Sequence, residues 1–348
     1  MHVRRSSAIL AVLGVVLIAA ALIVAFALAP SLQKLSNLDQ TSVATGTISM
    51  PDPAKPGAMV EQPIEMDRRL TTHKSSGNTS VAEIVTTIYA LPRAAGHPAL
   101  STSTVKYAVD RTNYSQAAAP SGVQVVDQKH ASTFSLPPNP SAEGQALFDP
   151  TLRQALPLKY VSTSSVDGRN QMGFTAAGTG PLADPDTAAA LKAALGKKFG
   201  TDGSSAPTMA LAALGVPQGK LAGLGATVPV NLVSDSSVKI LADQRFGTIV
   251  SVDQTAQFGA AFGDPSNPIM VLPLQTLQTK NTNADVASTI SSLKSAQTKL
   301  SFIKIWIPLA LAIIGLILLV VAWMRRQPGT GDDLAATPTP AGKATAGS

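Results

Sequence analysis

Two long apolar segments, one near each end of the chain, constrain its fold more than any other feature. Residues 8–29 (AILAVLGVVLIAAALIVAFALA) and residues 305–324 (IWIPLALAIIGLILLVVAWM) contain no charged or amide side chain. A helix rises about 1.5 Å per residue, so each segment is long enough to cross the ~30 Å hydrocarbon core of a bilayer. Because a helix satisfies its own backbone hydrogen bonds in lipid, we predict two transmembrane helices.

The residues that flank these segments predict where the membrane surfaces lie. Trp306 and Trp323 are the two tryptophans of the chain. They lie about 25 Å apart along a helix, which places one indole at each membrane–water interface. Basic residues complete the predicted interfaces at the chain-terminal ends of the segments: Arg4, Arg5, Arg325 and Arg326.

The distribution of basic residues also predicts the orientation of the chain. Two arginines precede the first segment and Lys34 is the only basic residue directly after it, so the N-terminus is predicted to stay in the cytoplasm. The second span then returns the C-terminus to the cytoplasm and leaves residues 30–304 outside the plasma membrane. The predicted cytoplasmic parts are residues 1–7 and a tail, residues 325–348, which has little apolar surface to bury and is expected to be disordered.

One alternative concerns the first apolar segment. The sequence ALAP at 27–30 resembles a signal-peptidase site, and cleavage after Ala29 would remove the segment. Its apolar core is longer than the roughly 7–15 residues of a signal peptide, and a proline directly after the cut hinders cleavage. We therefore favour a retained signal anchor, and the intact mass of the purified protein distinguishes the two.

The region between the two segments alternates apolar and polar residues with a period of two, which predicts β-strands. Asp167-Gly168 lies between two such stretches, in the pattern of a tight hairpin turn. Proline and glycine interrupt the strands throughout, which favours an antiparallel sheet over alternating strands and helices. The predicted fold is α+β: a mostly antiparallel, β-rich extracytoplasmic domain flanked by two transmembrane helices.

Three stretches of this middle region follow a helical period instead. Residues 31–39 and about 284–304 carry apolar residues on one face and predict helical stalks that continue the two spans. Residues 183–215 predict a small helical insert, in which Asp184 is the N-cap and Pro185 is the first helical residue.

Composition excludes several classes of function. The chain has no cysteine, so it has no disulfide framework and no thiolate chemistry. Its four histidines lack metal-ligand spacing, and no motif for a nucleophile or a phosphate-binding loop occurs, so we name no catalytic, metal-binding or cofactor-binding residue. The net charge of +6 is spread along the chain without a basic stripe, which argues against nucleic-acid binding.

The two spans also limit how the chain can act within a bilayer. Neither has a charged or amide residue that could line an ion path. Small residues at close helical spacing predict tight packing: Ala21, Ala25 and Ala29 in the first span, Ala312 and Gly315 in the second. The packing partner is either the other span or a second copy of the chain, which would give a homo-oligomer.

Several short motifs, in a fixed order between the two spans, resemble one known family. They are DRT at 110–112, FDP at 148–150, DGRNQMGF at 167–174 and GTIV at 247–250. The chain resembles the actinobacterial two-pass membrane family of unknown function that is often labelled porin PorA. We interpret the matching residues as structural: Asp110, Arg111, Thr112, Phe148, Asp149, Pro150, Gly168, Phe174 and Gly247. The chain departs from the family pattern at RFGTIV and in the alanine-rich insert, so the resemblance supports a shared fold more than a shared ligand surface.

Three functions are compatible with this sequence. The first is non-enzymatic: the exported domain binds or relays a cell-envelope component, a lipid or glycolipid, and has an apolar groove for it. The second is the pore that the family label implies, which would need oligomers or a barrel because one helical hairpin encloses no water. The third is a membrane-anchored envelope hydrolase, for which no nucleophile–base pair can be named. We favour the first and expect no enzymatic activity.

Overall fold

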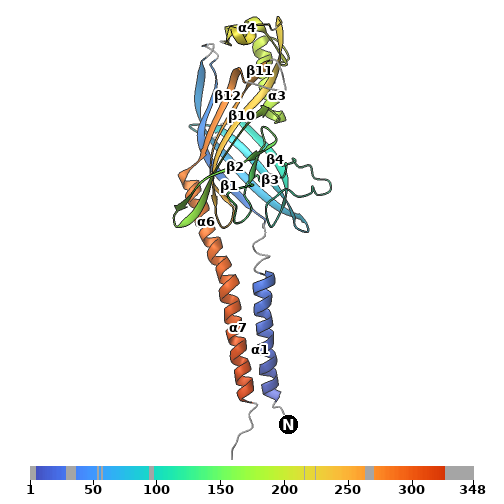
Figure 1. Cartoon of the computed structure of the whole chain (residues 1–348), viewed down its shortest axis with the longest axis vertical. Coiled ribbons are helices and arrows are strands. Elements are labelled where there is room, and N and C mark those ends of the chain that lie inside the picture. The colour runs from blue at the N-terminus through green and yellow to red at the C-terminus, as the bar shows by residue number, and fades with distance from the viewer. Residues whose placement is uncertain are drawn as a thin grey trace, which may run out of the picture. The chain divides into compact units, whose positions relative to one another are not determined.

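The chain folds into two compact units in a computed structural model. One consists of the two chain ends, Met1–Ser31 and Lys299–Ser348, and the other of Leu32–Thr298. Figure 1 shows the helices of the first unit and the large sheet of the second. The structure describes residues 5–28, 37–52, 55, 58–93, 98–214, 216–223, 225–262 and 270–325.

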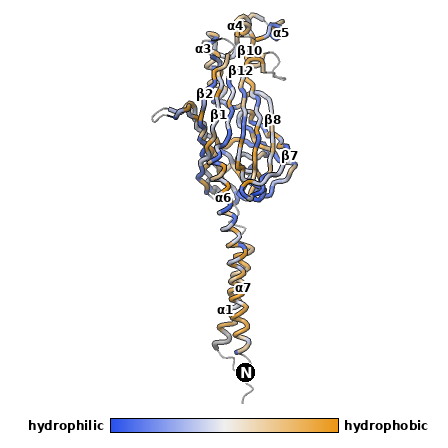
Figure 2. The backbone as a smooth tube through the Cα atoms, turned by 90° about the vertical axis from the view of Figure 1, so that its left-hand side faces the viewer, coloured by the Kyte–Doolittle hydropathy of each residue, from blue (hydrophilic) through white to orange (hydrophobic). Residues whose placement is uncertain are grey.

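The first unit is a pair of apolar helical segments. The elements are α1 (Arg5–Ile23), the π-helical turns η1 (Val24–Leu28) and η2 (Phe302–Trp306), and α7 (Ile307–Met324). The mean hydropathy of their most apolar windows is 3.2 in the first segment and 2.9 in the second, and only 11% of each window is buried. The hydrophobic colouring of α1 and α7 is visible in Figure 2. Both helices are long and apolar enough to cross a membrane.

Helices α1 and α7 pack on each other through small residues. A Cβ atom on Gly14 would lie 2.7 Å from the carbonyl oxygen of Gly315, and one on Gly315 would lie 2.8 Å from that of Gly14. Both glycines are buried, as are Ala21 and Ala322, each seven residues further along its helix. Of the small residues singled out in the sequence, Ala21 and Gly315 lie in this contact, and Gly14 is an addition.

The second unit is built on a ten-stranded sheet. Nine strands follow the order β4-β3-β2-β1-β12-β11-β10-β8-β7, and β9 pairs with β10 outside this path. The strands are β1 (Asp39–Pro51), β2 (Met59–Ser76), β3 (Thr79–Ala90), β4 (Ser101–Asp110), β7 (Lys159–Val166), β8 (Arg169–Pro181), β9 (Ser205–Pro207), β10 (Thr227–Asp243), β11 (Ile249–Phe262) and β12 (Leu272–Asn281). A separate pair is formed by β5 (Ala146–Asp149) and β6 (Gln154–Pro157). All these strand pairs are antiparallel, which confirms the predicted β-rich antiparallel domain.

The ten-stranded sheet buries one face and exposes the other. On the buried, inner face, Ile64 and Ile240 are at most 2% exposed. Because side chains alternate between the faces of a sheet, the residues next to them in each strand point to the outer face. Ion pairs lie on this outer face: Arg69–Asp39, Arg93–Glu65, Arg93–Asp67 and Lys106–Glu83. The inner face is therefore the core of the domain and the outer face is a surface suited to water.

Residues 111–158, here called the cover segment, lie over the inner face. Phe148 packs edge-on against Tyr107 of β4, with 5.9 Å between ring centroids. Leu136 belongs to the same buried cluster as Phe174 of β8. The cover segment thus supplies apolar side chains to two of the domain's hydrophobic clusters, one at β3 and β4 and one at β8 and β10.

The predicted helical insert is present beyond β8. It contains α3 (Pro185–Phe199), α4 (Thr208–Ala213) and α5 (Gln218–Leu221). The carboxylate of Asp184 accepts the backbone N–H of Thr187 at 2.9 Å, which confirms the predicted N-cap. Leu191 and Leu195 are buried in a cluster with residues of β10 and β11.

A helix of the second unit follows the last strand and coincides with most of the second predicted stalk. Helix α6 (Asn283–Ser301) buries Ile290 and Leu293 against Val250 of β11. The apolar residues Val286, Ile290 and Leu293 are spaced by four and then three positions, which is the pattern that the sequence displays.

The first predicted stalk is wrong in its described part. Asn37 and Leu38 are not helical and β1 begins at Asp39, where its register with β2 starts. A short apolar spacing is a weak helix signal, and long pairing with two neighbouring strands overrides it. Residues 31–36, the predicted N-terminal residues 1–4 and the predicted tail from 326 onwards lie outside the described residues.

Candidate functional site

A polar hollow of about 410 Å³ opens where the turn between β7 and β8, the turn between β10 and β11, the cover segment and α6 meet. It is lined by Asn139, Pro140, Gly168, Arg169, Asn170, Asp243, Gln244, Arg245 and Gln297. The lining side chains include four amides, two guanidinium groups and one carboxylate, so the hollow carries one excess positive charge. Its polar lining differs from the apolar groove that lipid binding predicts, and that groove stays a prediction.

A buried ion pair fixes the geometry of the hollow. Arg169 begins β8 and Asp243 ends β10, and their side chains are only 6% and 1% exposed. Nε and Nη2 of the arginine donate to Oδ2 of the aspartate at 2.8 and 2.7 Å, and Nη1 donates to Oε1 of Gln297 in α6 at 2.5 Å. Three of the five N–H donors of the guanidinium group are thus engaged within the protein.

The same aspartate fixes the turn that follows β10. Its Oδ1 accepts the backbone N–H groups of Arg245 (3.1 Å) and Phe246 (2.9 Å). Gly247 has a φ of +69°, and a Cβ atom there would lie 2.2 Å from the carbonyl oxygen of Leu136. Only glycine fits this position, and the turn therefore presents Arg245 in a defined place.

Arg245 supplies the positive charge that the hollow does not compensate. Its side chain is exposed, and its guanidinium carbon lies 5.6 Å from the ring centroid of Phe246. Within the part of the chain that the structure describes, Arg245 forms no ion pair. A guanidinium held on an aromatic ring can bind a phosphate or carboxylate through two parallel N–H groups, and neighbouring amides can bind hydroxyl groups. The hollow is therefore suited to an anionic, hydroxyl-bearing group.

Of the family-motif residues, only Gly168 lines this hollow, and Gly247 lies in the turn beside it. Gly168 lines it with a φ of +75°, as the second residue of the predicted hairpin turn. Gly247 shapes the turn that carries Arg245. The other motif residues lie elsewhere in the second unit.

Asp110 organises the turn after β4. Its Oδ1 accepts the backbone N–H groups of Thr112 (2.7 Å) and Asn113 (3.3 Å), and its Oδ2 accepts the side-chain amide of Asn78 (2.7 Å). Burial tends to raise the pKa of Asp110, but the hydrogen bonds from Thr112 and Asn78 outweigh burial and lower it. The backbone N–H of Arg111 donates to the carbonyl oxygen of Asn78 at 2.8 Å. The DRT motif thus joins two hairpin ends.

The FDP motif and Phe174 belong to the interior. Phe148 and Phe174 are 4% and 1% exposed on the inner face. Asp149 is also buried, and its Oδ1 accepts the backbone N–H and the hydroxyl of Thr151 at 2.8 and 2.6 Å, which closes the turn that contains Pro150. These contacts are those of a folded turn and a packed core.

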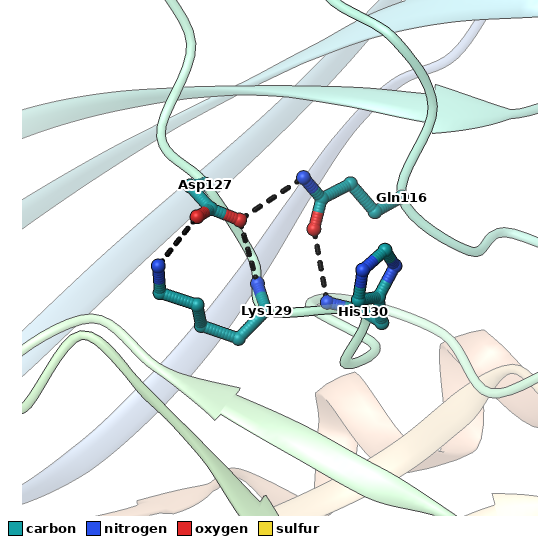
Figure 3. A network of polar contacts seen from close by, with 4 residues as sticks. All are labelled: Gln116, Asp127, Lys129 and His130. Carbon is teal, nitrogen blue, oxygen red and sulfur yellow. Dashed lines mark hydrogen bonds and ion pairs between the residues drawn. The ribbon is translucent and has the colours of Figure 1, made fainter.

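A second polar network lies in the cover segment and is drawn in Figure 3. Asp127 accepts hydrogen bonds from Nζ (2.5 Å) and the backbone N–H (3.0 Å) of Lys129 and from the amide of Gln116 (3.0 Å). The bond from the lysine side chain is the largest of the contacts that lower the pKa of Asp127 to about 2. Lys129 and His130 have φ values of +53° and +62°, so the network holds a turn in an uncommon backbone conformation. We interpret it as structural.

The predicted membrane-interface residues belong to the first unit. Trp306 and Trp323 are 61% and 63% exposed. Arg5 is the first residue of α1, and Arg325 directly follows α7. Arg4 and Arg326 lie outside the described residues. Their interfacial role stays a prediction.

Apart from Gly168, the residues that line the hollow are not among those singled out in the sequence. Arg169 and Asp243 are 74 positions apart, and Arg169 and Gln297 are 128 apart, so no local pattern joins them. The nearest available signal was DGR at the hairpin turn, because an arginine that directly follows a tight turn is placed at a sheet end.

Fold and hollow together define a class of protein: an antiparallel β-sheet domain between two apolar helical segments, with a polar hollow on the sheet domain. The family model described as Porin PorA matches residues 6–324. The chain therefore belongs to the Porin PorA family, which confirms the resemblance found in its motifs.

Two further comparisons add no functional information. The comparison with curated proteins gives no match. Among solved structures, a proposed thioesterase II from Thermobifida fusca aligns at 13% identity over 73% of this chain and 84% of that chain, with a TM-score of 0.12. A TM-score this low carries no argument about fold or activity.

Proposed function

We propose that this protein is a bilayer-anchored component of the cell envelope that binds or relays a lipid or glycolipid. In this proposal α1 and α7 span the plasma membrane, both termini are cytoplasmic, and the β-sheet domain stands in water on the outside. The polar hollow is its site for the ligand's headgroup.

The opposite polarity of the surfaces of the two units carries this proposal. A sheet that forms the wall of a membrane pore turns apolar side chains to the lipid and polar ones to the lumen. The sheet of this protein has the reverse arrangement, with Ile64 and Ile240 inside and ion pairs such as Lys106–Glu83 outside. The helices α1 and α7 instead expose apolar side chains, as helices in lipid do. This supports anchoring by helices and a sheet domain in water.

The headgroup assignment relies on Arg245 and the connection of the hollow to α6. Arg245 offers an exposed, uncompensated positive charge next to amide side chains. Gln297, which lines the hollow, precedes the second apolar run by only eight residues, so chain length alone keeps it within about 29 Å of Ile305. Such a tether supports a ligand drawn from the membrane.

The topology can be tested because the chain has no natural cysteine. Single cysteines replace Ser164, an exposed residue of β7, and Ala335 of the C-terminal tail, and intact cells are treated with a membrane-impermeant maleimide. We expect S164C to react in intact cells and A335C to react only after permeabilisation. Labelling of A335C in intact cells, or protection of S164C, contradicts the proposed topology.

The headgroup site can be tested by native mass spectrometry of the full chain released from detergent with phosphatidylglycerol. R245Q removes the uncompensated charge, and K239Q removes an exposed charge of β10 outside the hollow. We expect R245Q to lower lipid retention at least fivefold, and K239Q to match the wild type. Equal retention by all three proteins contradicts the assignment of the hollow.

A pore is the second candidate, because the family is described as a porin. The contact between Gly14 and Gly315 leaves no space between α1 and α7 of one chain, so a pore would need several copies. Recordings in planar bilayers over a range of protein-to-lipid ratios test it. Discrete conductance steps that rise with protein loading would favour the pore over the binding function.

A further inference from the structure

The inner face of the sheet contains one positive charge in an unexpected position. Arg68 lies in β2, directly opposite Ser42 of β1 and Thr86 of β3 in the strand register. Its place in the alternation of β2 puts it on the same face as Ile64, whose side chain is fully buried. An arginine is rare on a core face unless a partner compensates its charge.

The protein provides almost no compensation for this charge. Among the described residues, the Arg68 side chain makes one hydrogen bond, from Nη2 to the carbonyl oxygen of Thr133 in the cover segment, and at 3.5 Å it is long. Among the described residues no carboxylate lies within ion-pair distance of Arg68. Burial lowers the pKa of Arg68, while the nearby Tyr107 acts in the opposite direction. Arginine stays charged in proteins nonetheless, so the half-buried Arg68 carries a positive charge without a counter-charge among the described residues.

A polar group next to Arg68 is also unsatisfied. The hydroxyl of Thr133 is buried and has no hydrogen-bond partner among the described residues. Tyr107 is 4% exposed, and burial raises its pKa to about 12, so its hydroxyl is neutral and able to donate a hydrogen bond. An unsatisfied hydroxyl beside a half-buried cation without a counter-charge is a feature of a site built for an acceptor that the described residues do not supply.

The side chains around Arg68 in β2 and β3 are apolar. Two positions before and after Arg68 in β2 lie Met66 and Leu70, and opposite them in β3 lie Ile88 and Ile84. Ile84 is buried, whereas Met66, Leu70 and Ile88 are each partly exposed, so the cover segment leaves part of this apolar surface open. A ligand here meets one cation and an aliphatic surface.

We propose that the inner face at Arg68 binds a single-chain anionic amphiphile, with its carboxylate or phosphate on the guanidinium and its aliphatic chain along Met66, Ile84 and Ile88. A free inorganic anion would leave the aliphatic surface uncovered, and a neutral lipid would leave the cation uncompensated. The amphiphile covers the aliphatic surface and compensates the cation, because charge pairing and apolar burial act on the same molecule.

This site goes beyond the proposed headgroup function of the hollow and does not depend on it. The hollow includes Arg169 and Arg245 at the ends of strands, whereas Arg68 is in the middle of β2 on the opposite face of the sheet. The two proposals can therefore fail separately, and K239Q, which lies outside both sites, serves as the control for each.

The experiment is native mass spectrometry of the full chain in detergent with dodecanoate, 1-dodecanol or acetate as the probe. We expect the wild type to retain one dodecanoate and to retain dodecanol and acetate at least tenfold less. R68Q should lower dodecanoate retention at least tenfold, R68K should retain an intermediate amount, and K239Q should match the wild type. Thermal unfolding of the ligand-free proteins should show R68Q to be at least as stable as the wild type.

Three results overturn the proposal: retention of dodecanoate by R68Q at the wild-type level, retention of dodecanol by the wild type as strongly as dodecanoate, or competition by acetate equal to that of dodecanoate. If R68Q does not fold, the retention of the three probes by the wild type and by R68K still shows whether Arg68 binds the amphiphile. Loss of dodecanoate in R245Q but not in R68Q would assign the amphiphile to the hollow instead.

Discussion

Arg169 and Arg68 are arginines of the same sheet, and the protein surrounds them in opposite ways. Arg169, on the outer face, lies 2.7 Å from the carboxylate of Asp243 and donates a further bond to Gln297. Arg68, on the inner face, has only a 3.5 Å contact with a backbone oxygen. Arg169 is buried and Arg68 is half-buried, but among the described residues only the first has a counter-charge. A desolvated charge is stable only with such a partner, so Arg169 belongs to the structure and Arg68 to binding.

The difference also separates two kinds of binding surface. In the hollow, Asp243 compensates Arg169, so Arg245 provides the free charge and four amides surround it. That composition suits a hydrated, hydroxyl-bearing headgroup. At Arg68 the neighbours are aliphatic, which suits the chain of an amphiphile. The position of the nearest carboxylate thus distinguishes an arginine that shapes a site from one that binds in it.

The largest expected effect comes from removing the counter-charge of Arg169. D243N keeps an oxygen that can accept the N–H groups of Arg245 and Phe246, but it leaves Arg169 without a carboxylate. Removing one partner of a buried ion pair is strongly destabilising, so we expect the free energy of unfolding to fall by about 3 kcal/mol. Urea unfolding of the full chain in detergent, followed by circular dichroism, measures it.

The matched control is D235N on the same strand. Asp235 is exposed and accepts one hydrogen bond, from the hydroxyl of Thr179 at 3.2 Å. We expect its replacement to change the unfolding midpoint little. If D243N were as stable as D235N, Arg169 would not need its carboxylate. The argument that Arg68 needs an anionic group from a ligand would then fail too.

A smaller effect is expected at alkaline pH, and it tests whether Tyr107, which lies near Arg68, is withdrawn from water. Burial raises the pKa of Tyr107 to about 12, against an ordinary value of about 10 in the unfolded chain. Below pH 10 the hydroxyl is neutral in both states and this stabilisation is fully present. Between about pH 10 and 12 only the unfolded state loses the proton, so stability falls as the pH rises. The free energy of unfolding of the wild type should fall by up to about 2 kcal/mol in this range, and Y107F should abolish this loss.

Urea unfolding at pH 9 and at pH 11.5 measures this difference. The control is Y160F, because Tyr160 is 41% exposed. A wild-type loss of stability that persists unchanged in Y107F would show that the Tyr107 hydroxyl is not desolvated. In that case the inner face near Arg68 is wetter than the amphiphile proposal requires.

The parts of this fold that depend on local chemistry could be predicted. The apolar runs, the Asp167-Gly168 turn and the Asp184 cap each express a preference of adjacent residues, and each corresponds to an element of the structure. The stalk at 31–39 was misread near its end because Asp39 pairs with β2, a partner that a local helical period does not reveal.

The candidate sites depend on such distant partners throughout. In the sequence, Arg68 is one residue of RRL in an alternating stretch, and nothing local shows that it faces the core while Arg69 faces water. The register of β2 with β1 and β3 decides this, and a shift of one residue would exchange the two. Periodicity therefore predicted a sheet, and only the three-dimensional register identified which arginine lacks a partner.

The smallest expected effect concerns Arg69, the neighbour of Arg68 in β2, and its ion pair with Asp39. Arg69 donates to both carboxylate oxygens of Asp39, at 2.8 and 2.6 Å, yet the two side chains are 57% and 59% exposed. The hydrogen bond from Arg69 lowers the pKa of Asp39, so R69Q should return that pKa toward its ordinary value in an NMR titration. The urea midpoint at pH 7 should nevertheless not move, because water screens an exposed pair and solvates either partner when the other is removed. A loss in R69Q comparable to that in D243N would mean that exposure does not weaken ion pairs on this sheet. The contrast between Arg169 and Arg68 would then have to rest on geometry alone, without the argument from desolvation.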